Sequence, residues 1–207
     1  MLSVYPSEVE ILPWAGHLGG KLVQEVVPVI LQSQSTLVFT NTRNQSEMWY
    51  QLLLDAYPDF AGQIALHHSS IDANLRSWVE ENLSLGALKA VVSTSSLDLG
   101  VDFKPVDTVI QNGSSKGVAR FMQRAGRSGH SPFETSKIYF VPTHSLELIE
   151  SSALKEAVKN KVIEIENEVR YYDEQQFLDC CDYSEQIDTL LKLRKKILDR
   201  YVIDNLD

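Results

Sequence analysis

The chain alternates short apolar runs with longer segments in which apolar residues recur at helical spacing. Five short runs predict strands at residues 36–40, 63–68, 87–94, 106–111 and 136–141, and the first of them is rich in β-branched residues. Between and after these runs we expect helices at residues 43–57, 73–86, 117–126 and 144–160. Strands that alternate with helices across short loops predict an α/β fold, a parallel sheet with helices on both faces.

The same rhythm divides the chain into three parts. Residues 1–35 carry three prolines and the glycine-rich "GHLGGK", which interrupt long elements, so we expect an irregular lead-in. Residues 36–160 form the predicted α/β domain. The strand–helix rhythm has stopped by about residue 171, and the amphipathic "SEQIDTLLKLRKKILDRYVI" predicts that residues 161–207 are a mostly helical extension. Its basic "KLRKK" is interpreted as a solvated helix face.

Polar clusters follow three of the predicted strands directly. They are "TNTR", "HHSS" and "STSS", and ligand sites of parallel α/β sheets lie at this carboxyl edge. Adjacent residues of a strand point to opposite faces, so His67 and His68 are not expected to share a metal ion, and we expect no metal site. His67 is expected to be packed, and Trp78, on the following helix, is expected to lie in the core.

The distribution of charge points to one candidate anion site. The chain carries a formal charge of −9, yet three arginines fall within the eight residues 120–127 of "ARFMQRAGRSGH". An anion site on such an acidic protein must be built locally, from a few arginines and backbone N–H groups. No apolar run approaches the roughly 20 residues that span a bilayer, and the two cysteines are adjacent, which excludes a disulfide framework. We expect an intracellular protein without a membrane partner.

Three stretches together resemble the second motor domain of superfamily 2 helicases. "TLVFTNTR" (36–43) is similar to motif IV, "VVSTSSLDLGVDF" (91–103) to motif V and "QRAGRSGH" (123–130) to motif VI. With "PWAGHLG", "ALHHSSID", "KGVARFMQRAGRSGH" and "KIYFVPTHSLELIE", the chain looks like the Lhr-type, ligase-associated DEXH-box DNA helicases. The resemblance covers roughly residues 10 to 160 and implies a RecA-like fold.

The resemblance gives the arginine cluster a role in ATP hydrolysis. It implies that Arg127 is an arginine finger, that Gln123 senses the γ-phosphate and that Arg124 helps to hold the interface between two motor domains. Arginine suits this chemistry because its charge is permanent and its planar fork matches the oxygens of a phosphoryl group that gains charge in the transition state.

Further nucleotide contacts follow from the same match. Gly126 and Gly129 are expected to let the backbone approach the triphosphate without Cβ atoms in the way. Asp102 is expected near the ribose, and Gly100 is expected to supply a backbone conformation or close approach beside it. His130 stands where many relatives carry a second arginine, and we expect it to be a neutral hydrogen-bonding residue at the interface, because a histidine is mostly neutral at pH 7.5.

The match also predicts a track for nucleic acid. Thr94 and Ser95 are expected to bond a backbone phosphate, a contact that reads no sequence. Five further residues are candidate contacts to nucleic acid: Asn41, Thr42, Arg43, His68 and Ser69.

One half of a helicase motor is missing from the sequence. No GxxxxGK[ST] loop occurs, since in "AGHLGGKL" position 15 is alanine and Lys21 is followed by Leu22. ATP with Mg²⁺ is therefore expected to be held mainly by a first RecA-like domain of the same polypeptide, and this chain alone is expected to be inactive. The resemblance implies 3′-to-5′ movement on single-stranded or partly duplex DNA in bacterial DNA repair, in the cytoplasm at the nucleoid, with a DNA ligase and a nuclease as further partners.

Two other functions remain open at this point. An RNA-directed motor would make the same phosphate contacts, because RNA is told apart from DNA through its 2′-hydroxyl groups. A non-catalytic RecA-like adaptor would keep the fold and bind a protein partner. The intact motif VI argues against the adaptor, since a protein without catalysis has no reason to keep an anion site.

Overall fold

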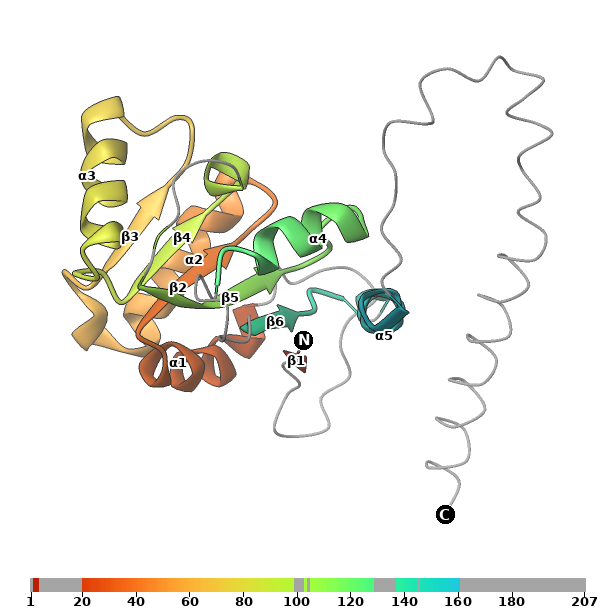
Figure 1. The fold of residues 1–207 in the computed structure, drawn as a ribbon. Coiled ribbons are helices and arrows are strands. Elements are labelled where there is room, and N and C mark those ends of the chain that lie inside the picture. Colours follow the sequence, from red (N-terminus) through yellow and green to blue (C-terminus); the bar gives the residue numbers. More distant parts are fainter. Residues whose placement is uncertain are drawn as a thin grey trace, which may run out of the picture. The chain divides into compact units, whose positions relative to one another are not determined.

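The computed structural model describes residues 2–3, 20–98, 103, 105–128, 137–144 and 146–160, all within the first of two compact units, Met1–Glu164. The described residues form a six-stranded sheet in which every pairing is parallel, with the order β1-β6-β5-β2-β4-β3 (Figure 1). Its strands are β1 (Leu2–Ser3), β2 (Ser35–Phe39), β3 (Ile64–His67), β4 (Ala90–Ser93), β5 (Val106–Asn112) and β6 (Lys137–Val141).

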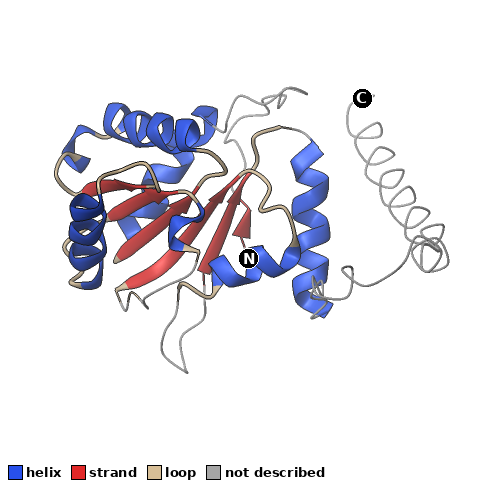
Figure 2. Ribbon diagram, turned by 90° about the horizontal axis from the view of Figure 1, so that it is seen from above, coloured by secondary structure: helices blue, strands red, loops and turns tan. Residues whose placement is uncertain are grey.

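Helices cover both faces of the sheet, as the sequence predicts (Figure 2). One face packs against α1 (Val23–Gln32) and α2 (Arg43–Ala56), and the other against α3 (Ala73–Ser84), α4 (Val118–Ala125) and α5 (Leu146–Asn160). Three short 3-10 helices complete the described elements: η1 (Gly20–Leu22), η2 (Pro58–Phe60) and η3 (Ser95–Leu97). Among the described residues, no helix is long and apolar enough to cross a bilayer.

Helix α1 corrects the prediction that residues 1–35 are irregular. Four residues at helical spacing, Val23, Val26, Val27 and Ile30, are buried in one of the two cores. Pro28 lies inside this helix, where it removes one hydrogen bond. The buried apolar face of α1 outweighs that loss, so proline alone is a poor guide to the end of a helix that packs well.

One packing detail also differs from the prediction. Trp78 is 51% exposed on α3, so its assignment to the core is wrong; Val79 and Leu83 form the buried face of that helix.

Helix α2 packs against the sheet through the fully buried apolar residues Trp49 and Leu53. Met48, Leu52 and Tyr57 also occur at helical spacing, but they are only partly buried and pack at the margin of the same core. The predicted helical extension lies outside the described residues.

Parallel pairing brings the ends of four strands into line. Phe39 of β2 stands opposite Ser93 of β4 on one side and Gln111 of β5 on the other, and Ser93 also stands opposite His67 of β3. The residues that follow these strands therefore share one edge of the sheet, which we call the rim. The turns that leave it are fixed by helix caps. At the start of α2, the hydroxyl of Thr42 accepts a hydrogen bond from the N–H of Gln45, and the side chain of Gln45 accepts one from the N–H of Thr42.

Candidate functional site

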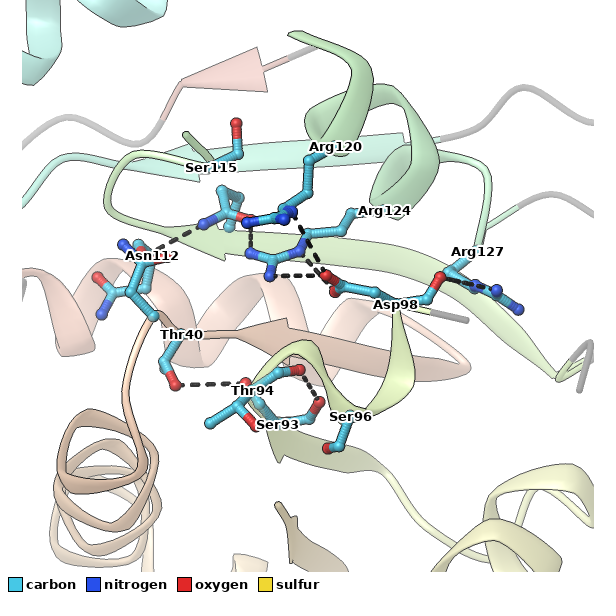
Figure 3. A network of polar contacts seen from close by, with 12 residues as sticks. Thr40, Ser93, Thr94, Ser96, Asp98, Asn112, Ser115, Arg120, Arg124 and Arg127 are labelled. Atoms are coloured by element: carbon cyan, nitrogen blue, oxygen red, sulfur yellow. Dashed lines mark hydrogen bonds and ion pairs between the residues drawn. The ribbon is translucent and has the colours of Figure 1, made fainter. Parts of the chain in front are cut away.

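Asp98 is the centre of a buried ionic network (Figure 3). It follows η3 and is 6% exposed. Its carboxylate accepts two hydrogen bonds from Arg124, with 2.7 Å from Nε to Oδ1 and 3.1 Å from Nη2 to Oδ2. Arg124 is itself 2% exposed, donates through Nη1 to Oε1 of Gln111 at 2.7 Å and lies over the ring of Phe39. Because its charge is matched by Asp98, Arg124 has a structural role here, and its predicted role at a domain interface stays a prediction.

Two more arginines approach the same aspartate. Arg127 donates to the backbone carbonyl of Asp98, at 2.8 Å from Nη2 and 3.3 Å from Nε. Arg120 has a side chain that is 45% exposed, and its Nε lies 3.9 Å from Oδ2 of Asp98. Three guanidinium groups thus lie around one aspartate, two of them at its carboxylate and the third at its backbone carbonyl. The expected concentration of positive charge is present.

Two neighbours of Arg127 are exposed to solvent. Gln123 and Gly126 are exposed at the end of α4. A Cβ atom at Gly126 would meet only ordinary contacts, at 3.5 Å from the carbonyl oxygens of Gln123 and Met122, and its φ of −66° is accessible to any residue. The described fold therefore does not itself require glycine, and the expected approach of a triphosphate stays a prediction. Gly100, Asp102, Gly129 and His130 lie outside the described residues.

Motif V supplies hydroxyl groups at the rim. Thr94 is half-buried and occupies the N-cap position of η3, but its side chain makes no capping hydrogen bond, while Ser95 is exposed. The backbone beneath is held in place: the N–H of Thr94 donates to the carbonyl of His67 at 3.3 Å, and the hydroxyl of Thr40 donates to the carbonyl of Ser93 at 3.3 Å (Figure 3). Such hydroxyls can contact phosphate oxygens without reading sequence.

Motif IV ties the neighbouring strand ends together. Asn41 donates through Nδ2 to the carbonyl of Ser114 at 2.8 Å, which joins the ends of β2 and β5. Arg43 donates through Nη1 to the hydroxyl of Ser70, which joins the end of β2 to the turn after β3. Asn41, Thr42 and Arg43 are all exposed, although the hydroxyl of Thr42 is engaged in capping α2.

The two adjacent histidines point to opposite sides, as expected. His67 is buried between Ser96, 2.8 Å from Nδ1, and Glu80, 2.9 Å from Nε2. Burial lowers the pKa of His67, and the Glu80 carboxylate opposes that shift. His68 is also buried, with Nε2 3.4 Å from Oε1 of Glu47, so Ser69 is the exposed member of the predicted pair. The described residues contain no cluster of three or more metal-ligating side chains.

Sequence reasoning missed two residues of this site. Asp98 stands in the quoted motif V, but nothing in the sequence shows that it pairs with an arginine 26 positions later. Gln111 ends an apolar strand and reads as the polar boundary of that strand. Only the pairing of β2 with β5, and the packing of α4 against the sheet, brings them together with Arg124.

Comparison with known proteins agrees with this geometry. The helicase conserved C-terminal domain family matches residues 21–131. The chain is 38% identical over 147 residues to ATP-dependent helicase Lhr-Core protein 2 of Thermococcus barophilus, covering 71% of the chain and 17% of that protein. It is 38% identical over 149 residues to ATP-dependent helicase Lhr-Core of Methanothermobacter thermautotrophicus, covering 70% of the chain and 17% of that protein.

A solved structure shows the same fold. The Mycobacterium smegmatis helicase Lhr bound to single-stranded DNA and AMP-PNP superposes with a TM-score of 0.70 and 30% identity, over 79% of this chain and 22% of that one. The sheet and its helices are therefore RecA-like, as the sequence predicts. The chain spans only about a sixth of the length of the two relatives it matches.

Proposed function

The chain belongs to the helicase conserved C-terminal domain family, and from this we propose that it is the second motor domain of an ATP-dependent 3′-to-5′ DNA helicase or translocase. In this proposal it supplies the arginine finger and part of the track for the bound strand. A first RecA-like domain of the same polypeptide supplies the nucleotide pocket. The relatives it resembles are named ATP-dependent helicases, and one solved relative holds single-stranded DNA.

The placement of Arg127 carries the proposal. Arg124 is enclosed and paired with the carboxylate of Asp98, whereas Arg127 is half-buried just beyond the end of α4 and donates to the backbone carbonyl of Asp98. Its guanidinium has a permanent charge and a planar fork that matches phosphate oxygens. Arg127 is thus positioned to contact a phosphoryl group that another domain binds.

The proposed cofactor is ATP with Mg²⁺. ATP would supply the phosphoryl group that is transferred to water, with Mg²⁺ held mainly by the first motor domain. On this chain, the guanidinium of Arg127, the amide of Gln123 and the uncrowded backbone at Gly126 are the groups suited to phosphate oxygens. The permanent charge of Arg127 would stabilise the charge that develops as the bond to the γ-phosphorus breaks.

The rim is the proposed strand track. Exposed Asn41, Arg43, Ser69 and Ser95 and half-buried Thr94 lie at the ends of β2, β3 and β4, which neighbour one another in the sheet. Their donors suit a phosphate backbone and leave the bases unread, as a translocating motor requires. We propose single-stranded or partly duplex DNA as the substrate, a role in DNA repair beside a ligase and a nuclease, and a place in the bacterial cytoplasm.

Arg127→Ala in the full-length protein tests this function. Because an arginine finger contributes about 10³–10⁵ in rate, DNA-stimulated ATP turnover should fall by about that factor while ATP binding and thermal stability are retained. Arg76→Ala, on α3 away from the network, is the matched control and should keep its turnover. A fall of less than about tenfold for Arg127→Ala would make that residue structural and remove the basis of the proposal.

A further inference from the structure

Gln111 is a fully buried amide that no sequence motif explains. It lies near the end of β5, is 0% exposed and uses both ends of its amide. Its Oε1 accepts the hydrogen bond from Nη1 of Arg124 at 2.7 Å. Its Nε2 donates to the carbonyl of Gly113 at 2.9 Å and to that of Asn112 at 3.3 Å. One side chain therefore joins the arginine network to the turn that follows β5.

That turn is part of the rim. The residue after Gly113 is Ser114, whose carbonyl accepts the hydrogen bond from Nδ2 of Asn41. A continuous series of polar contacts thus runs from Arg127 through the carbonyl and carboxylate of Asp98, then Arg124 and Gln111, to the turn that holds Asn41. In Figure 3 Asn112 and Arg127 lie on opposite sides of Arg124 and Asp98.

The turn is held tightly enough to transmit a displacement. Gly113 and Lys116 have φ of 73° and 57°, and a Cβ at Gly113 would stand 3.2 Å from Cγ2 of Thr143. A positive φ at a residue other than glycine costs free energy and persists only where the surroundings impose it. The buried carboxylate of Glu147 accepts a hydrogen bond from the N–H of Ser114 at 2.9 Å and fixes the other side of the turn.

The oxygen of Gln111 has a structural purpose, because Asp98 accepts only from Nε and Nη2 of the buried Arg124 and leaves Nη1 to Gln111. That purpose needs an acceptor alone. What the amide adds is a donor that reaches Gly113 while its oxygen holds Arg124. Such a two-ended link fixes the position of the turn relative to motif VI.

We propose that Gln111 is a positioning residue that couples strand binding at the rim to the placement of Arg124 and Arg127. The inference rests on the proposed function, in which the rim holds the strand and Arg127 acts on ATP. A strand phosphate that displaces Asn41 or Ser114 moves the turn, the turn moves Gln111, and Gln111 moves the arginine network. Nucleic acid thereby raises ATP turnover through a side chain that touches neither ligand.

Gln111→Glu separates the two ends of the link in the full-length protein. The carboxylate keeps an acceptor for Arg124 but has no hydrogen to donate to Gly113. The measured quantity is the ratio of ATP turnover with a saturating oligothymidylate to turnover without it. Coupling between two sites typically changes a binding affinity by about 5- to 150-fold. Taking the lower figure for the turnover ratio, we expect that ratio to fall by about fivefold or more. A purely structural role would lower both turnovers together and leave the ratio unchanged, which would overturn the inference.

Thr108→Val is the matched control on the same strand. Thr108 is also buried, and it lies nearer the start of β5, away from the rim. Its hydroxyl accepts a hydrogen bond from the hydroxyl of Ser33 at 2.9 Å. Its ratio should stay at the wild-type value. A loss equal to that of Gln111→Glu would overturn the inference, because any disturbance of β5 would then suffice. Gln111→Met, which removes both hydrogen bonds, should lower the ratio at least as far.

A measurement on the unmodified protein covers the case in which the Gln111 variants do not fold. Adding the oligothymidylate without nucleotide should change amide hydrogen exchange at residues 124–128, and unchanged exchange there overturns the inference. The proposed function fails in a different way: wild-type turnover is then not stimulated by DNA, or survives Arg127→Ala. Stimulated wild type, inactive Arg127→Ala and an unchanged ratio in Gln111→Glu would reject the coupling alone.

Discussion

Two arginines three positions apart differ in burial and in the part of Asp98 that they contact. Arg124 is almost fully enclosed, so its charge requires a carboxylate, and Asp98 meets it with two hydrogen bonds. Arg127 lies beyond the end of α4, is half-buried and donates to the backbone carbonyl of Asp98. Asp98 therefore holds both arginines, one through its carboxylate and the other through its backbone.

Asp98→Ala should strongly destabilise the 207-residue chain. The substitution leaves the buried guanidinium of Arg124 without its counter-charge, and breaking a buried pair in this way costs about 3–5 kcal/mol of unfolding free energy. Urea denaturation measures the change. Glu81→Ala, on the exposed side of α3, is the control and should stay within about 0.5 kcal/mol of wild type. Adding Arg124→Met to Asp98→Ala should recover part of the loss; a loss below about 1 kcal/mol would show that Arg124 finds another partner.

Single residues also mark the limit of what the sequence predicts. The three arginines lie within eight residues of one another, and the hydroxyl residues of motif V are consecutive. The order of residues alone therefore reveals each of these two groups. Asp98 and Gln111 reach Arg124 across 26 and 13 positions. Those contacts depend on strand register and on the angle at which α4 packs, which residue spacing does not encode.

Among the elements, alternating polarity identifies most strands and helices, and packing decides the rest. The five predicted strands and four predicted helices correspond to β2 to β6 and α2 to α5, because each has a clear period and marked ends, such as Asp72 at the start of α3. Helix α1 was not predicted, because Pro28 interrupts the spacing of its apolar residues. The exposure of Trp78 was not predicted either, because helical spacing alone does not say which face of α3 meets the sheet.

The contact of β3 with α3 and η3 should be sensitive to pH through His67. Burial lowers its pKa below the ordinary value of 6.5, despite the opposing carboxylate of Glu80, so the unfolded chain binds more protons than the folded one below that value. The contribution of His67 to stability is therefore complete above about pH 6.5 and is lost as the pH falls towards its lowered pKa.

Denaturation of wild type and His67→Asn between pH 7.5 and pH 5 measures this contribution. The unfolding free energy of wild type should decline more steeply below about pH 6.5, by at most about 1.4 kcal/mol per pH unit for one proton. Far-ultraviolet circular dichroism at pH 7.5 checks that the variant is folded. A wild type that gains stability relative to the variant as the pH falls would mean that Glu80 outweighs burial.

As a whole, the chain combines an acidic composition with a cluster of three arginines in its described part. Its net charge of −9 disfavours general attraction to nucleic acid, so in the proposed function strand contact would depend on the few donors of the rim. A motor domain of this kind would gain little affinity by itself. In the proposal, the strand is held when both halves of the track act together, and Arg127 then acts on a nucleotide bound by the other half.

The purified 207-residue chain should therefore not hydrolyse ATP, with or without single-stranded DNA. Its sequence has no phosphate-cradling GxxxxGK[ST] loop, so Arg127 has no bound triphosphate to stabilise. Phosphate release measured with saturating ATP, Mg²⁺ and an oligothymidylate should equal that of the Arg127→Ala chain, which serves as the control for contaminating enzymes. Turnover that rises with the oligothymidylate and disappears in Arg127→Ala would show that this chain holds ATP by itself, and the division of the motor between two domains would be wrong.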